Sequence, residues 1–196
     1  MESVRRTLLA RDLLPWTVTF LAIPSAGYLA SAVVGPTDTI AVALTGGAIV
    51  GVIVGFAQAL GSRRRLGLIS WPLGTAIGMS LGFALASFAV GYRTLLPDLA
   101  LMGLINGAVL GIAQAIAFPA QTRVRWLWAP VTAALWALGW TVTTLAGIAV
   151  DRQFIVFGAS GAIVYAALSG LALHLLLPDR AAADAEPYGQ TAAVGR

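Results

Sequence analysis

The sequence predicts an all-α integral membrane protein with six transmembrane helices arranged as three repeated helical hairpins. Three observations lead to this fold class. The 196-residue chain is 59% hydrophobic and only 10% charged, too few charges to cover a soluble domain of this size. Six apolar stretches are long enough to cross a bilayer, which takes about 20 helical residues. An internal repeat then groups these stretches in pairs.

The predicted spans follow one another with short connections and carry no charge in their interiors. We expect residues 1–12 to be a cytoplasmic N-terminal segment. Residues 178–196, rich in Ala, Pro and Gly, are expected to form a disordered cytoplasmic tail. Between them, residues 13–177 form the membrane domain. Its six spans lie near 13–34, 39–60, 67–91, 97–118, 126–149 and 153–177.

The arginines predict the direction of the spans, because cytoplasmic loops carry an excess of basic residues. Two arginines fall on the opposite side, Arg93 and Arg152, and ten fall on the side of the termini. Both termini are therefore expected in the cytoplasm. Four tryptophans fall at the cytoplasmic starts of odd-numbered spans, where indole rings favour the headgroup level. These predicted membrane anchors are Trp16, Trp71, Trp126 and Trp128.

The repeat is visible in two pairs of segments, each 56 residues apart. "LASAVVG" (29–35) recurs as "LASFAVG" (85–91), and "GAIVGVIVGFAQAL" (47–60) recurs as "GLINGAVLGIAQAI" (103–116). A third, degenerate copy gives repeats of about 13–65, 66–125 and 126–177. Two spans per copy give every copy the same orientation, so the copies should be related by an axis along the membrane normal.

Glycines spaced four residues apart mark one face on three of the predicted helices. Positions four apart drift by only about 40° around a helix, and small residues let membrane helices approach closely. We assign these glycines to helix packing, with a homo-oligomer interface or a substrate path as alternatives. They are Gly47, Gly51, Gly55, Gly74, Gly78, Gly82, Gly103, Gly107 and Gly111.

Four polar side chains lie within the predicted spans and form a candidate ligand cluster. Gln58, Gln114 and the sole histidine, His174, lie at similar depths near the cytoplasmic ends, and Asn106 lies in the outer half of its span. Buried polar residues in spans are functional candidates; the alternative is one interhelical hydrogen bond each. The chain has no cysteine and no metal-ligand motif, so no metal or cofactor is expected.

The segment "GASG" at 158–161, followed by apolar residues, resembles the active-site serine helix of rhomboid proteases. That resemblance implies Ser160 as a nucleophile, paired in the family with a histidine on a later helix. Here His174 lies on the same span, about 21 Å away at 1.5 Å per residue, whereas a general base must approach to about 3 Å. A rhomboid-like hydrolase is therefore only a remote alternative.

The repeated GxxxGxxQ hairpins, each followed by arginines, are similar to a loose group of uncharacterised small prokaryotic multi-pass proteins. This resemblance implies a prokaryotic plasma membrane and brings no activity. We therefore expect a non-enzymatic, structural or accessory bundle, or a self-associating one. The alternative is a passive channel or transporter for a small neutral solute or lipid-like ligand. Expected partners are the lipid bilayer and either other membrane subunits or a second copy, with no nucleic acid.

Overall fold

The computed structural model describes residues 13–63, 65–120, 122, 125–148 and 156–176. The described chain is all-helical, without strands. The predicted segments 1–12 and 178–196 lie outside the described residues. Apart from the start of α2, the main helices begin and end within six residues of the predicted spans. They are α2 (Ala22–Val34), α3 (Ile40–Gly61), α4 (Ser70–Ala89), α5 (Leu96–Ala117), α6 (Trp128–Leu145) and α7 (Ala159–Leu176).

The first helix is longer than α2 alone, because the helical residues from Leu13 and the short 3-10 helix η1 (Thr19–Leu21) precede it. Pro24 explains the 3-10 segment. A proline ring clashes with the carbonyl four residues earlier, here that of Phe20, and cannot donate the α-helical hydrogen bond. Another short 3-10 helix, η2 (Arg125–Leu127), leads into α6.

Five helical segments in the described residues are long and apolar enough to cross a membrane. They are Leu13–Val34, α3, α4, α5 and α7. The sixth helix, α6, has 18 residues but is not among them. Its three tryptophans and four threonines lower its mean hydropathy, and most of these side chains are at least partly buried in the bundle. The described helices are therefore apolar and compatible with a membrane, but by length and composition five of the six predicted spans qualify.

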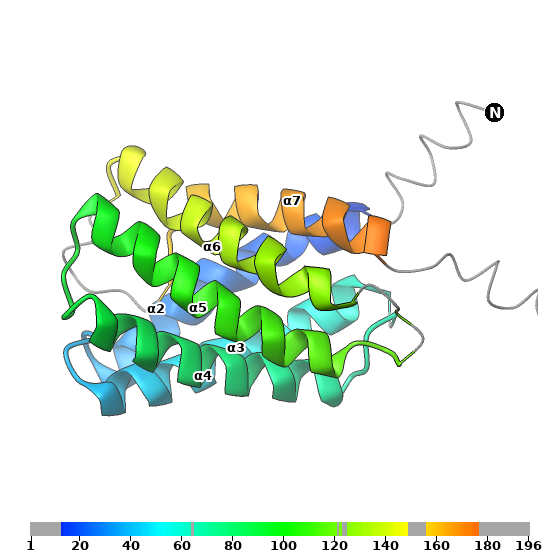
Figure 1. Ribbon diagram of the computed structural model, residues 1–196, viewed down its shortest axis with the longest axis horizontal. Helices are drawn as coiled ribbons and strands as arrows, with labels where there is room; N and C mark the ends of the chain where they lie inside the picture. Colours follow the sequence, from blue (N-terminus) through cyan, green and yellow to red (C-terminus); the bar gives the residue numbers. More distant parts are fainter. Residues whose placement is uncertain (1–12, 64, 121, 123–124, 149–155, 177–196) are drawn as a thin grey trace, which may run out of the picture.

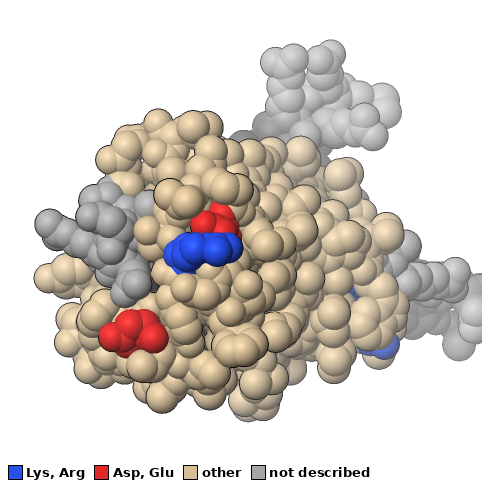
Figure 2. All heavy atoms as spheres, turned by 60° about the vertical axis from the view of Figure 1, so that its left-hand side comes forward, with Lys and Arg blue, Asp and Glu red and all other residues tan. Residues whose placement is uncertain are grey.

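The helices form a ring in which each packs against the next in chain order (Figure 1). The ring closes where α7 packs against η1 and α2. The first helix begins and α7 ends at the same end of the bundle, which we call the termini end (Figure 1). The opposite end, the far end, holds the α2–α3 and α4–α5 connections. Figure 2 turns the far end forward and shows few charged side chains on an uncharged surface.

The charged residues in the described part lie at the ends of the bundle. Asp38 and the Arg93–Asp98 ion pair, with an N–O distance of 2.9 Å, belong to the far end. Arg63, Arg65 and Arg125 belong to the termini end. The long sides of the bundle instead expose leucine, isoleucine, valine and phenylalanine. This distribution is what a bilayer requires of a spanning bundle.

The glycine faces pack against neighbouring helices of the same chain. A methyl group added at Gly51 would lie 2.5 Å from Ala76 Cα on α4, and one at Gly107 would lie 2.8 Å from Ala133 Cα on α6. Gly78 similarly faces Leu110 on α5. The other predicted packing glycines make equivalent contacts: Gly47 and Gly55 with α4, Gly74 and Gly82 with α5, and Gly103 and Gly111 with α6.

Three of the four predicted tryptophan anchors are not at the surface. Trp16, Trp71 and Trp128 are almost completely buried inside the bundle, so their interpretation as headgroup anchors is wrong. Trp126 alone is exposed, at 53%, with the Arg125 guanidinium 5.5 Å from its ring centre. Side-chain direction explains the difference, because residues two apart on a helix point to different sides.

Candidate functional site

Gln58 and Gln114 meet inside the bundle although they lie 56 residues apart. Gln114 Nε2 donates to Gln58 Oε1 at 3.4 Å and to Thr75 Oγ1 at 2.9 Å. Both glutamine side chains are buried. Two of the four predicted polar residues are therefore brought together, on α3 and α5, with α4 between them.

Two buried tryptophans complete this network. Trp71 Nε1 donates to Gln58 Oε1 at 3.1 Å, and Trp128 Nε1 donates to Gln114 Oε1 at 2.8 Å. In each case the tryptophan at the start of one helix donates to the glutamine near the end of the preceding helix. We call Gln58, Trp71, Thr75, Gln114 and Trp128 the Trp–Gln cluster. The rings of Trp71 and Trp128 also pack on Phe118, with centroid distances of 5.1 and 5.6 Å.

His174 does not join the Trp–Gln cluster. It lies half-buried in the last turn of α7, beside a small pocket that Trp16, Arg63 and Arg65 also line. The third tryptophan, Trp16, donates instead to Ser169 Oγ at 3.0 Å. This bond joins the first helix to the last, and we call it the closing bond.

The repeat pattern explains why His174 lies outside the Trp–Gln cluster. In α3 and α5 the glutamine follows the last glycine of the stripe by three residues, as in Gly55 and Gln58. On α7 the corresponding glycine is Gly170, where an added methyl group would meet the indole ring of Trp16. Three residues further is Leu173, which is buried, whereas His174 is turned about 100° away. The sequence signal for Leu173 was thus present in the spacing.

Asn106 is buried toward the far half of the bundle and is separate from the Trp–Gln cluster. Its Nδ2 lies 3.8 Å from Met79 Sδ, a weak acceptor, and its Oδ1 has no hydrogen-bond partner. The Oδ1 atom instead lies against Gly82 of α4, where an added methyl group would approach it to 2.5 Å. Asn106 therefore contributes packing and one weak polar contact.

Ser160 and His174 lie on one continuous helix, α7, at its two ends. Fourteen residues of helix separate them by about 21 Å, far beyond the reach of proton transfer. The Ser160 hydroxyl has no hydrogen-bond partner. Among the described residues, this geometry offers the serine no base, which favours the packing interpretation of GASG.

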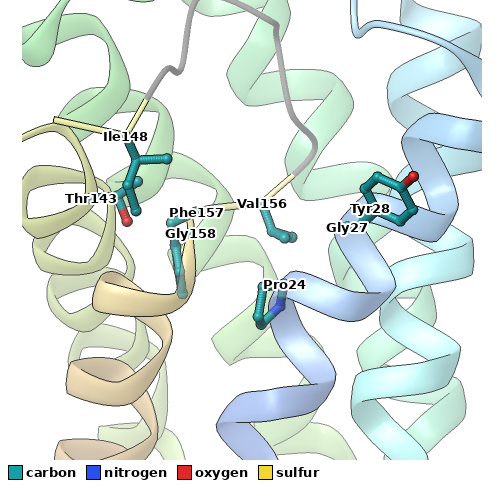
Figure 3. Close-up of a pocket in the computed structure, with 8 residues that line it drawn as sticks. All are labelled: Pro24, Gly27, Tyr28, Thr143, Ile148, Val156, Phe157 and Gly158. Carbon is teal, nitrogen blue, oxygen red and sulfur yellow. The ribbon is translucent and has the colours of Figure 1, made fainter. Parts of the chain in front are cut away.

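Besides the pocket at His174, two more cavities are lined by described residues. A groove of about 160 Å³ lies between α2 and the start of α7 toward the far end (Figure 3). Its lining is almost entirely apolar and comes from Pro24, Gly27, Tyr28, Thr143, Ile148, Val156, Phe157 and Gly158. A second, central cavity of only about 10 Å³ is enclosed by the helices and is lined in part by Gln58, Gln114 and Tyr165.

Sequence reasoning missed the tryptophan donors, Thr75, Ser169 and Tyr165. The glutamine spacing pointed to the acceptors but carried no information about which helix start faces them. Among the described residues, no group of three or more His, Asp or Glu side chains could hold a metal ion. No family model, curated protein or solved structure matches this chain.

Proposed function

We propose that the chain is a non-enzymatic plasma-membrane protein of a prokaryote whose six helices cross the bilayer as three hairpins. In this proposal both termini are cytoplasmic, so the termini end faces the cytoplasm. Support comes from the five apolar spans and from the common end at which the first helix begins and α7 ends. Arg63, Arg65 and Arg125 lie at that same end, as the positive-inside rule requires.

Single cysteines can test this orientation without background, because the chain has no cysteine of its own. Asp38→Cys lies in the α2–α3 connection and Leu68→Cys in the α3–α4 connection; both positions are exposed. A membrane-impermeant maleimide should label Asp38→Cys in intact cells, and Leu68→Cys only after permeabilisation. The reverse pattern, or equal labelling of both, would overturn the orientation.

The proposed role is that of a structural or accessory subunit. The observation that carries it is how completely the interior is occupied by the chain's own packing. The glycine faces contact neighbouring helices, the glutamines bond to Trp71 and Trp128, and the central cavity is closed. Because the interior side chains are bonded to and packed against one another, we expect the protein to bind its partners through its outer surface.

This role predicts contacts made by the apolar exterior, with another subunit or with a second copy. Native mass spectrometry of the protein purified in mild detergent detects either kind of partner. Co-purification of another subunit at a fixed ratio, or a homo-oligomer, supports the structural role. A bare monomer that keeps no partner in native nanodiscs contradicts it. Self-association through the glycine faces is disfavoured, because those faces already contact neighbouring helices within the chain.

A second candidate function is binding of a lipid-like ligand, and the groove beside α2 favours it. The groove is apolar and open on one side, and the exposed ring of Tyr28 lies at its rim. In a bilayer this opening would face acyl chains, so the occupant we propose is one acyl chain of a membrane lipid. The central cavity, far smaller, gives no comparable support to a solute path along the bundle axis.

The groove can be tested by filling it. Ile148→Trp places an indole in the lining, whereas Leu145→Trp, on a nearby exposed position outside the lining, is the matched control. Native mass spectrometry after delipidation should show one retained lipid on the wild-type chain and on Leu145→Trp, but none on Ile148→Trp. Equal retention by all three proteins would contradict the groove as the binding site.

A further inference from the structure

The central cavity is bordered by polar groups that the Trp–Gln cluster does not use. Tyr165, Trp136 and Gln58 line this cavity together, and neither Tyr165 Oη nor Trp136 Nε1 has a hydrogen-bond partner within the protein. Both side chains are at least 97% buried. They come from α7 and α6, and both line the same cavity as Gln58.

The hydrogen-bond inventory around this cavity leaves an excess of donors. Gln58 Oε1 already accepts from Trp71 and Gln114, which uses both of its lone pairs. Gln114 Nε2 gives one hydrogen to Gln58 and the other to Thr75. The remaining groups are the Gln58 amide hydrogens, the Trp136 N–H, the Tyr165 hydroxyl and one lone pair of Gln114 Oε1, which accepts only from Trp128. Donor hydrogens therefore still outnumber the acceptor sites.

We propose that the centre of the bundle binds one water molecule, held by Tyr165, Trp136 and Gln58. Water can accept from the Trp136 N–H and the Gln58 amide while it donates to Tyr165 Oη, three bonds of the kind that buried waters make. The volume of about 10 Å³ suits a single water and nothing larger. A bare ion is disfavoured because the described lining is neutral and burial of a charge without a partner is costly.

This water would connect α7 to the Trp–Gln cluster. At the position of the third hairpin where a glutamine is expected, the chain has Leu173, which cannot form hydrogen bonds through its side chain. Tyr165, two turns earlier on α7, lines the cavity from the same hairpin. The bond from Trp128 already links α6 of the third hairpin to the cluster. The water would therefore supply the polar link between α7 and Gln58 that Leu173 cannot form, whichever ligand or partner the outer surface binds.

X-ray radiolytic labelling with mass spectrometry tests this site on the wild-type protein in nanodiscs. Hydroxyl radicals formed from a bound water modify adjacent side chains even when bulk solvent cannot reach them. Tyr165 is compared with Phe83, an equally buried aromatic residue that does not line the cavity and has similar intrinsic reactivity. Tyr165 should be labelled several-fold faster than Phe83.

A second variant separates a bound water from transient opening of the bundle. Tyr165→Phe keeps the ring but removes the hydroxyl, so labelling at position 165 should fall to the rate of Phe83. Wild-type Tyr165 labelled no faster than Phe83 would overturn the proposal. Undiminished labelling in Tyr165→Phe would overturn it too, because the radicals would then come from solvent that enters during opening.

Discussion

Two aromatic regions of the bundle have similar composition but differ in how their indoles are used. At the termini end, Trp71 and Trp128 pack around Phe118, and each donates its N–H to a glutamine. Toward the far end, Trp136 and Trp140 pack around Phe157, at 4.7 and 6.1 Å, and neither indole N–H donates to another group of the protein.

The bonded indoles at the termini end specify which helices pair, whereas the indoles toward the far end only fill the space between helices. A buried N–H bonded to one acceptor fixes both the partner helix and its register, because an unpaired donor is costly in an apolar interior. Packed rings without polar partners tolerate small shifts. The groove beside α2 lies next to the aromatic residues Trp136 and Trp140. Phe157 packs against their rings and also lines the groove. We expect the termini end to be the rigid part of the bundle.

The largest expected effect on stability comes from replacing a buried amide side chain at the termini end, compared with one in the far half. Gln114→Met removes bonds to Trp128, Thr75 and Gln58 and leaves the Trp128 N–H unpaired. It should lower the free energy of unfolding by about 2–3 kcal/mol. Asn106→Leu, the matched change in the far half, removes only the weak contact with Met79 and one unpaired oxygen.

Unfolding in mixed micelles measures both variants. Asn106→Leu should be within about 0.5 kcal/mol of the wild type, as expected when a poorly satisfied polar group is replaced by an apolar one of similar shape. Equal destabilisation by the two variants would remove the distinction between the regions.

A tryptophan pair sharpens the comparison, because the volume change is the same at both positions. Trp71→Phe and Trp140→Phe remove the same atoms from fully buried sites, but only Trp71 loses a hydrogen bond. We expect Trp71→Phe to be more destabilising by about 1 kcal/mol. Thermal unfolding in detergent gives the difference, and a larger loss for Trp140→Phe would contradict it.

The smallest expected effect is at the closing bond. Ser169→Ala removes the acceptor of Trp16, and interhelical hydrogen bonds in membrane proteins average about 0.6 kcal/mol. Ser160→Ala is the control on the same helix, because that hydroxyl has no partner. The two variants should differ by about that average in unfolding experiments. If Ser160→Ala is the more destabilising, the closing bond does not hold the ring together.

Helix positions were predictable from the sequence, because length and hydropathy are local properties. The glutamine pair was also accessible, since a repeat places equivalent residues at equivalent depths. The sequence could not predict which residues in the first turn of a helix face the interior of the bundle. An indole at the start of a span suits both the headgroup layer and a buried acceptor, so Trp71, Trp128 and Trp126 were indistinguishable. The structure separates them because Gln58 and Gln114 lie opposite two of the three.

The third hairpin shows a different limit. His174 is the polar residue of this region, yet the interior position is Leu173, and Trp16 donates to Ser169. Tyr165 was missed because it falls in the register of Val50 and Asn106, not in that of the glutamines. A degenerate repeat keeps the packing positions but moves the polar groups, and pattern matching alone cannot follow them.

The most direct test of the account is a ¹⁵N-indole NMR spectrum of the six tryptophans in nanodiscs, recorded after transfer to D₂O. Each signal is assigned with a single Trp→Phe variant. The closed bundle predicts that Trp16, Trp71 and Trp128 keep their indole protons while Trp126 exchanges at once. Exchange of Trp71 and Trp128 as fast as that of Trp126 would contradict it, because these indoles would then lie at the membrane surface and not between the helices.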